Sequence, residues 1–245
     1  MIKIILILLS LSSFLFGAES VTIPTMNFNL SAPDTPQQLV SSLNVLVVLT
    51  LLFLAPSMVL VMTTFTRFVI VFGFLRQALG TQQVPPTQLL VMLAMVLTFF
   101  VMEPVGTKAY EAGIKPYLAE QIGYEEAFTK TALPFKSFMI RNTREKDLAL
   151  FFRIRKMDNP QSIADVPLSI IIPAFVISEL KTAFEVGFLI FLPFLVIDMV
   201  VASILMSMGM MMLPPVMISL PFKILVFVLI DGWSLLIGNL IASIK

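Results

Sequence analysis

The sequence predicts an all-α integral membrane protein with two long, proline-interrupted helical hairpins and an inserted helical extracytoplasmic loop. Of its 245 residues, 58% are hydrophobic and the mean hydropathy is +0.98. Only 13% are charged, whereas a soluble domain has about 25%. The charges are also uneven, since 10 of the 16 Lys/Arg and 9 of the 15 Asp/Glu lie in 103–168. Apolar stretches at 43–75, 84–105 and 168–243 flank this polar segment.

The N-terminus has the pattern of a secretory signal peptide. Lys3 precedes an apolar run over 4–16, and Gly17 and Ala18 offer small residues for cleavage. We therefore expect a signal peptide at 1–18, with an uncleaved short anchor as the alternative, because the run is short for a membrane span. The polar, proline-containing residues 19–42 then form an extracytoplasmic N-terminal segment.

The first hydrophobic helical hairpin is expected over 43–105. Its turn lies at 76–86, where Gly80 and the Pro85-Pro86 pair interrupt the apolar pattern. Arg67 and Arg76 favour the cytoplasmic side for this turn, because basic residues concentrate there. The polar segment 106–167 consequently returns to the extracytoplasmic side as a loop or subdomain with helical character.

The last segment, 168–245, is predicted to hold an amphipathic contact helix and a second hydrophobic hairpin. Its apolar run is too long for one helix, and we expect helices at about 186–208 and 213–240. The stretch 173–188 mixes aromatic and charged residues, which indicates contact with another subunit. The alternative is a surface helix with one local ion pair between Lys181 and Glu185. The predicted contact residues are Phe175, Glu179, Lys181, Phe184 and Glu185.

Five methionines fall within residues 206–212, directly before the Pro214-Pro215 pair. Methionine is flexible and easily repacked, and tandem proline ends a helix. Both properties suit a constriction that seals and then yields. The alternative is that these methionines face lipid or a neighbour in the ordinary way. The candidate gate residues are Met210, Met211 and Met212.

Several charges lie within or beside the apolar runs. A charge at the centre of a bilayer costs at least about 3 kcal/mol on insertion scales, so these helices are expected either to be buried in an oligomer or not to lie in lipid as their hydropathy suggests. The charges either form buried pairs or line a proton or ion pathway, and their spacing does not decide between the two. The residues concerned are Arg67, Asp198, Lys223 and Asp231.

The composition excludes several functions. The chain has no cysteine and no histidine, which removes disulfides, Cys/His metal sites and thiol or histidine catalysis. It has no glycine-rich nucleotide-binding motif and no basic face for nucleic acid. We therefore predict that the chain is not an enzyme and has no cofactor, no metal and no nucleic-acid partner.

Three long motifs carry a family resemblance. Residues 54–86 (LAPSMVLVMTTFTRFVIVFGFLRQALGTQQVPP), 173–188 (PAFVISELKTAFEVGF) and 208–233 (MGMMMLPPVMISLPFKILVFVLIDGW) resemble, in order, the FliP family of type III secretion export-gate proteins. The resemblance is close over 43–105 and 168–243 and loose over 106–167.

The resemblance implies a subunit of the flagellar type III protein export gate, needed for flagellum assembly. Such proteins form a ring of five copies with FliQ and FliR in the inner membrane, inside the flagellum basal body. They work with other export-apparatus and basal-body proteins and pass unfolded flagellar proteins across the membrane. In such a ring Met210–Met212 would converge on the axis as a pore gate. The alternatives are an export gate of a virulence type III system, a small-solute or ion transporter, and a structural scaffold.

Overall fold

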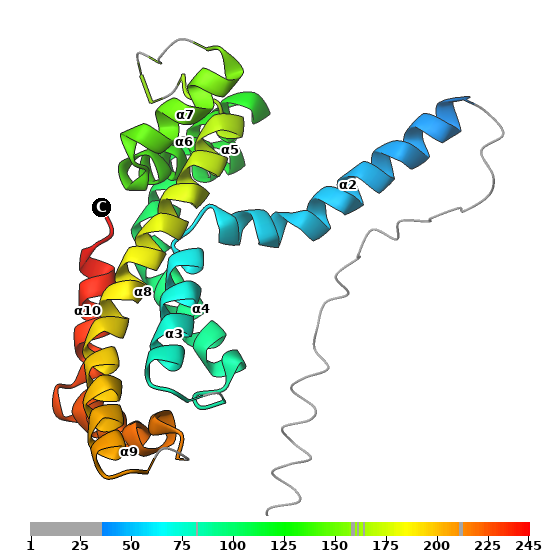
Figure 1. Ribbon diagram of the computed structural model, residues 1–245. Coiled ribbons are helices and arrows are strands. Elements are labelled where there is room, and N and C mark those ends of the chain that lie inside the picture. Colours follow the sequence, from blue (N-terminus) through cyan, green and yellow to red (C-terminus); the bar gives the residue numbers. More distant parts are fainter. Residues whose placement is uncertain (1–35, 82, 158–159, 161, 164, 211–212) are drawn as a thin grey trace, which may run out of the picture. The chain divides into compact units, whose positions relative to one another are not determined.

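The computed structural model describes residues 36–245 except 82, 158–159, 161, 164 and 211–212, and every regular element in this part is a helix (Figure 1). The predicted all-α class is therefore confirmed. The predicted signal peptide at 1–18 and residues 19–35 of the predicted extracytoplasmic segment lie outside the described residues.

Helix α2 (Pro36–Val61) crosses the boundary between two compact units, 1–49 and 50–245. It begins seven residues before the apolar stretch predicted at 43. The apolar stretch 43–75 is divided between two helices, because α2 ends at Val61 and α3 (Phe65–Ala78) begins after a turn. In this turn the Thr63 hydroxyl donates to the Leu60 carbonyl (2.7 Å) and accepts from the Phe65 amide (3.4 Å). A hydroxyl that bonds to the backbone in this way competes with the helical hydrogen bonds.

Helices α3 and α4 (Thr87–Ala109) form the first hairpin, with the turn in the predicted place. Gly80 has a φ of +77°, in the left-handed region that glycine enters without steric cost. Arg76 spans the turn, since its Nη1 donates to the Thr87 hydroxyl at 2.7 Å. The turn residues of the sequence therefore predicted where the chain reverses direction between α3 and α4.

The polar segment is helical, as predicted. It consists of a π-helix η1 (Tyr110–Ile114), α5 (Lys115–Leu118), α6 (Tyr124–Asn142) and α7 (Glu145–Arg155). These helices gather at one end of α8, where α6 and α7 bury Phe138, Met139 and Phe152 against it (Figure 1). The polar segment therefore shares a hydrophobic core with α4 and α8.

Helix α8 (Leu168–Ser207) is one continuous helix of 40 residues, so the prediction of a separate contact helix followed by a helix at 186–208 is wrong. Pro173 and Pro193 both lie inside it. An internal proline removes one backbone hydrogen bond and often ends a helix. Here the residues on both sides of Pro193, including Ala183 and Phe194, belong to one core with α3, and this packing keeps the helix in one piece.

The chain breaks after α8, as predicted, but the next helix is not single. It divides into α9 (Pro215–Leu229) and α10 (Gly232–Ala242), which meet at 64°. Asp231, at the bend, has a left-handed backbone (φ 51°). A Cβ on Gly232 would lie 2.2 Å from the ring of Phe227, so only glycine allows the two helices to fold this closely.

Two core clusters result. One joins α3 to α4, α8, α9 and α10, and the other joins α4 to α6, α7 and α8. Among the described residues, the helical run Thr87–Leu118 and α8 are long and apolar enough to cross a membrane, and α9 with α10 adds a third if the bent pair is one broken span. The membrane-protein class predicted from composition is consistent with this arrangement.

Candidate functional site

Three groups of charged side chains connect α8 to its neighbours, and a methionine-rich turn follows its end. α8 runs from the polar helices α6 and α7 to α9, with α3 and α10 alongside (Figure 1). One helix therefore positions all of these groups.

The deepest group is a pair between Arg67 on α3 and Glu179 on α8. Arg67 Nε donates to Oε2 at 2.7 Å and Nη2 donates to Oε1 at 2.5 Å, so the guanidinium grips the carboxylate with two parallel bonds. The side chains are 3% and 1% exposed. The third guanidinium nitrogen, Nη1, donates to the Ser243 hydroxyl at 2.9 Å, which ties the residues after α10 to the pair.

The second group lies near the far end of α8. Lys223 on α9 donates to Asp198 Oδ2 at 2.6 Å and to the carbonyl of Ala78 at 3.1 Å. Ala78 is the last residue of α3, where a cation is favoured because carbonyl groups there lack helical partners. The Ser219 hydroxyl donates to the other oxygen of Asp198 at 2.5 Å. This group joins α3, α8 and α9.

The third group joins α7 to α8. Asp147 accepts from Lys181 and from the Ser178 hydroxyl (2.8 Å), and Arg144 Nη2 donates to Glu185 at 2.6 Å. Burial opposes ionisation of Asp147, but the hydrogen bonds from Lys181 and Ser178 and the charges of Lys181 and Arg144 outweigh it, so the pKa of Asp147 is lowered. Asp147 therefore stays ionised and holds α7 to α8.

The pairing hypothesis named four charged residues without assigning partners. The structure pairs Asp198 with Lys223 and pairs Arg67 with Glu179, a residue outside that set. Within the described residues Asp231 forms no ion pair. The alternative of a local Lys181–Glu185 ion pair is wrong, because Lys181 pairs with Asp147 and Glu185 pairs with Arg144.

Burial also narrows the predicted contact surface. Phe175 and Glu179 are buried inside the chain itself, so neither presents a surface to another subunit. Lys181, Phe184 and Glu185 remain exposed on α8. The amphipathic pattern of 173–188 therefore described a helix with one face in its own core. Contact with another subunit stays a prediction for the three exposed residues.

Sequence reasoning missed several members of these groups. Asp147 and Arg144 lie in the polar segment, whose mixed charges give no signal of which one faces α8. Ser243 is likewise distant from its partner in sequence. Ser219 had a signal, because it stands four residues before Lys223 and so shares one face of a helix with it.

The methionine-rich turn begins where α8 ends. Gly209 has a φ of +74°, the Gly209 amide donates to Met206 O (3.0 Å), and the Met210 amide donates to Leu205 O (3.0 Å). These two bonds form a Schellman motif, which ends a helix at a glycine. Met206 and Met208 are 62% and 63% exposed, and Met210 is also exposed, whereas Met211 and Met212 lie outside the described residues. The end of the hairpin therefore presents flexible apolar side chains.

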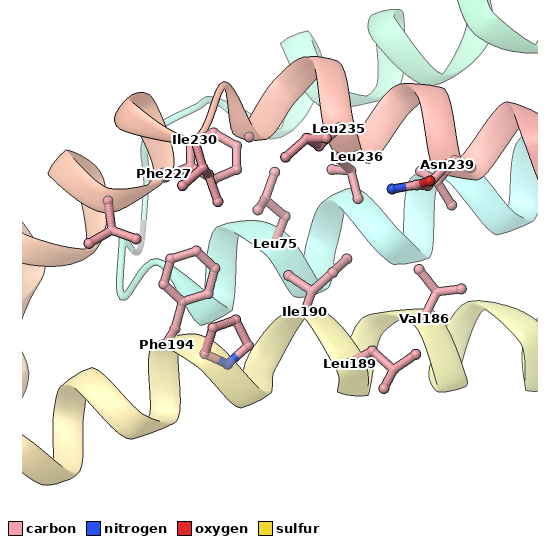
Figure 2. A pocket seen from close by; sticks show the side chains of 14 residues that line it. Leu75, Val186, Leu189, Ile190, Phe194, Phe227, Ile230, Leu235, Leu236 and Asn239 are labelled. Atoms are coloured by element: carbon pink, nitrogen blue, oxygen red, sulfur yellow. The ribbon is translucent and has the colours of Figure 1, made fainter.

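An apolar cavity of about 430 Å³ lies between α8, α9 and α10, with Leu75 of α3 at its floor (Figure 2). Its lining is aliphatic and aromatic apart from Asn239. A cavity of this lining can receive an apolar group and offers no acid, base or nucleophile. Within the described part of the chain, no cluster of three or more acidic, histidine or cysteine residues could hold a metal ion.

A family model, the FliP family, matches residues 48–240 of the chain. The chain belongs to this family. It is 53% identical over 215 residues to the flagellar biosynthetic protein FliP of Bacillus subtilis, which covers 88% of the chain and 97% of that protein. It is 49% identical over 242 residues to the protein of the same name in Caulobacter vibrioides (99% and 90%), and 47% identical over 223 residues to that of Treponema pallidum (90% and 82%).

Family membership confirms the resemblance predicted from the three motifs. The chain is a membrane-embedded component of flagellar biosynthesis and export, and it is not an enzyme. The charged groups described above pair with one another, which fits a structural role for them.

Proposed function

We propose that the chain is a subunit of the flagellar type III protein export gate. With FliQ and FliR it forms the channel through which unfolded flagellar proteins leave the cell, in the inner membrane at the flagellum basal body. Family membership supports the flagellar assignment, and each relative cited above carries the flagellar name. We favour this over a virulence export gate and over a small-solute transporter for that reason.

The observation that carries the channel proposal is the methionine-rich turn. A Schellman motif ends α8 at Gly209 and two prolines begin α9, so Met210 follows the end of a helix and is exposed. Exposed thioether side chains at the end of a hairpin are soft enough to pack together and to move apart. In a ring of about five copies, Met210–Met212 of each copy would form an apolar constriction that blocks ions by excluding water.

The test is ion conductance through the reconstituted assembly. Replacing Met210, Met211 and Met212 with glycine is expected to raise the resting conductance, because the constriction loses its apolar side chains. Met217→Ala on α9 is the matched control, since Met217 is exposed but lies beyond the turn. An intact assembly whose resting conductance does not change would contradict the gate. Uptake of small solutes by the same vesicles tests the transporter alternative.

The contact between ring subunits is proposed to use the exposed face of α8. Phe184 is exposed beside Lys181 and Glu185, and its ring lies 5.4 Å from that of Phe74 within the chain. Phe184→Ser removes apolar surface from this face and is expected to weaken the ring on a native gel. Phe128→Ser, an exposed phenylalanine on α6, is the control. Rings of normal size and amount from Phe184→Ser would argue against this face.

A further inference from the structure

We propose that Asp198, Ser219 and Lys223 are positioning residues that hold the methionine-rich turn where it closes the channel. They join α8, which ends at this turn, to α9, which begins after it (Figure 1). We call the three side chains the α8–α9 clamp. This inference rests on the gate proposed above, because it assigns the residues that keep that gate closed at rest.

The hydrophobic core ends well short of the methionine-rich turn. The last buried core residues before the turn are Phe194 on α8 and Phe227 on α9, and their ring centroids are 6.4 Å apart. In α9, all of which the structure describes, the side chains buried before Phe227 are those of Ser219 and Lys223, and both are polar. In the described remainder of α8, Leu205 is the next buried side chain after Phe194. The end of the hairpin is therefore attached to the chain mainly by polar contacts.

The clamp lies about one helical turn beyond this ring contact on each helix. Asp198 follows Phe194 by four residues, and Lys223 stands four residues before Phe227. The ammonium group of Lys223 donates to Asp198 Oδ2 at 2.6 Å, and the Ser219 hydroxyl donates to Oδ1 at 2.5 Å. Both carboxylate oxygens of a residue on α8 are thus bonded to α9. Such charge-assisted hydrogen bonds are short and strong, so they fix how α9 lies against α8.

The end of α3 supports the clamp from a third side. Lys223 also donates to the Ala78 carbonyl at 3.1 Å. A Cβ on Gly80 would lie 3.5 Å from Val216 Cγ1 and 3.8 Å from Lys223 Nζ, so the start of α9 lies against the turn that follows α3. Because α3 packs along α8 in the main core, the clamp positions α9 relative to that core as well as to α8.

Apolar packing between α8 and α9 is incomplete beside the clamp. An apolar groove of about 420 Å³ lies there, lined by one side of α8 from Val196 to Leu205 and by Ile218 and Phe222 of α9. A close-packed interior leaves few voids larger than a water molecule, so the two helices gain little from apolar contact along this groove. Loss of the clamp would therefore leave α9 free to shift against α8. Since α9 begins directly after the methionine-rich turn, such a shift would move the methionines.

The first measurement reports the position of α9 and does not depend on conduction. The chain has no cysteine, so Met206→Cys and Met217→Cys place spin labels at two exposed positions, one on each side of the turn. Double electron–electron resonance on the assembled full-length chain, with labelled copies diluted in unlabelled ones, gives the distance within one copy. Lys223→Met is expected to broaden this distance distribution and shift it to longer distances. Lys223→Arg, which keeps the charge, should restore the parent distribution.

The second measurement is the resting conductance of the reconstituted assembly. Lys223→Met is expected to raise it about tenfold, which is the change in an equilibrium produced by losing one hydrogen bond to a charged group. Ser219→Ala is a milder variant, because Asp198 keeps its bond to Lys223, and should raise conductance about threefold. It decides the question if Lys223→Met does not assemble. Asp147→Asn, which weakens the attachment of α7, is the matched control and should change neither measurement.

Three results would overturn the proposal. In assemblies of parent size, Lys223→Met leaves the distance distribution unchanged, or Asp147→Asn broadens it as much, which shows a general loss of stability. Alternatively, Lys223→Met leaves conductance unchanged while glycine at Met210–Met212 raises it, so the gate exists and the clamp does not hold it. If the glycine variant also leaves conductance unchanged, the gate itself is wrong and the clamp holds no gate. The distance measurement then shows by itself whether the clamp fixes α9 against α8.

Discussion

The two ion pairs on α8 that involve α3 differ in how far water reaches them. Glu179 and Asp198 are 19 residues apart, about 28 Å along the helix axis. Arg67 and Glu179 are 3% and 1% exposed, whereas Lys223 and Asp198 are 3% and 28% exposed. Arg67 and Glu179 are planar groups joined by two hydrogen bonds. The ammonium group of Lys223 instead divides its hydrogen bonds between Asp198 and the Ala78 carbonyl at the end of α3. We infer that the Arg67–Glu179 pair fixes how α3 packs on α8. Loss of the Lys223–Asp198 pair should destabilise the fold less, because water can hydrate Asp198.

The strongest test of this comparison is to break the buried pair. Glu179→Leu leaves the guanidinium of Arg67 without a carboxylate in a site that excludes water. Removing one partner of a buried pair costs about 3–5 kcal/mol, and we expect a loss of that size in the free energy of unfolding. Denaturant unfolding of the purified chain in detergent measures it.

The double variant Arg67→Met/Glu179→Leu is the control. It removes both charges and replaces them with apolar groups, which is often neutral for a buried pair, so most of the lost stability should return. A single variant that unfolds like the parent, or a double variant no better than the single, would show that the pair does not fix α3 on α8.

Breaking the second pair should cost less. Lys223→Met leaves Asp198 partly in water and still bonded to Ser219, so we expect a loss of about 2 kcal/mol, within the range for a hydrogen bond to a charged group. Lys223→Arg, which keeps the charge, is the matched variant. A loss equal to that of Glu179→Leu in the same unfolding measurement would remove the distinction between the two pairs.

The smallest effect is expected from Asp147, which anchors α7 to α8 and depends on pH. Its pKa in the folded chain is lowered, so its stabilisation is present above the ordinary aspartate pKa of about 4 and is lost as pH falls through the lower folded value. Asp147→Asn should lose about 1 kcal/mol of unfolding free energy at pH 7. The parent should approach the variant below about pH 4.

Glu185→Gln is the control for this pH dependence, because Glu185 is exposed and its pair with Arg144 is worth only a few tenths of a kcal/mol. If the difference between the parent and Asp147→Asn stays constant from pH 7 to below pH 4, the ionised carboxylate does not hold α7.

Part of the fold followed from the sequence. The turn at 76–86 and the break between helices after 208 were predicted because glycine and proline interrupt apolar runs. The structure places Gly80 and Gly209 there, each with a left-handed backbone. The methionines were predicted to stand at the end of a hairpin for the same reason. Local signals of this kind require no knowledge of distant parts of the chain.

The pairing of the buried charges could not be predicted from the sequence. Arg67 lies 112 residues from Glu179, and nothing in their spacing links them. The amphipathic pattern around Glu179 predicted a face for another subunit, because a pattern shows that a helix has two faces and does not show what covers each. Likewise, the length of the apolar run predicted that the segment before 186 is separate from the helix that follows, whereas α8 is continuous from Leu168 to Ser207.

The sequence by itself determined that this is a helical membrane protein of the FliP family, because composition, apolar runs and motifs are properties of consecutive residues. The tertiary structure alone decided that Glu179 pairs with Arg67, that Lys223 donates to the last carbonyl of α3, and that α8 is one continuous helix. Those outcomes depend on which side chains meet when helices pack, since a buried charge is stable only where its partner stands within hydrogen-bond distance.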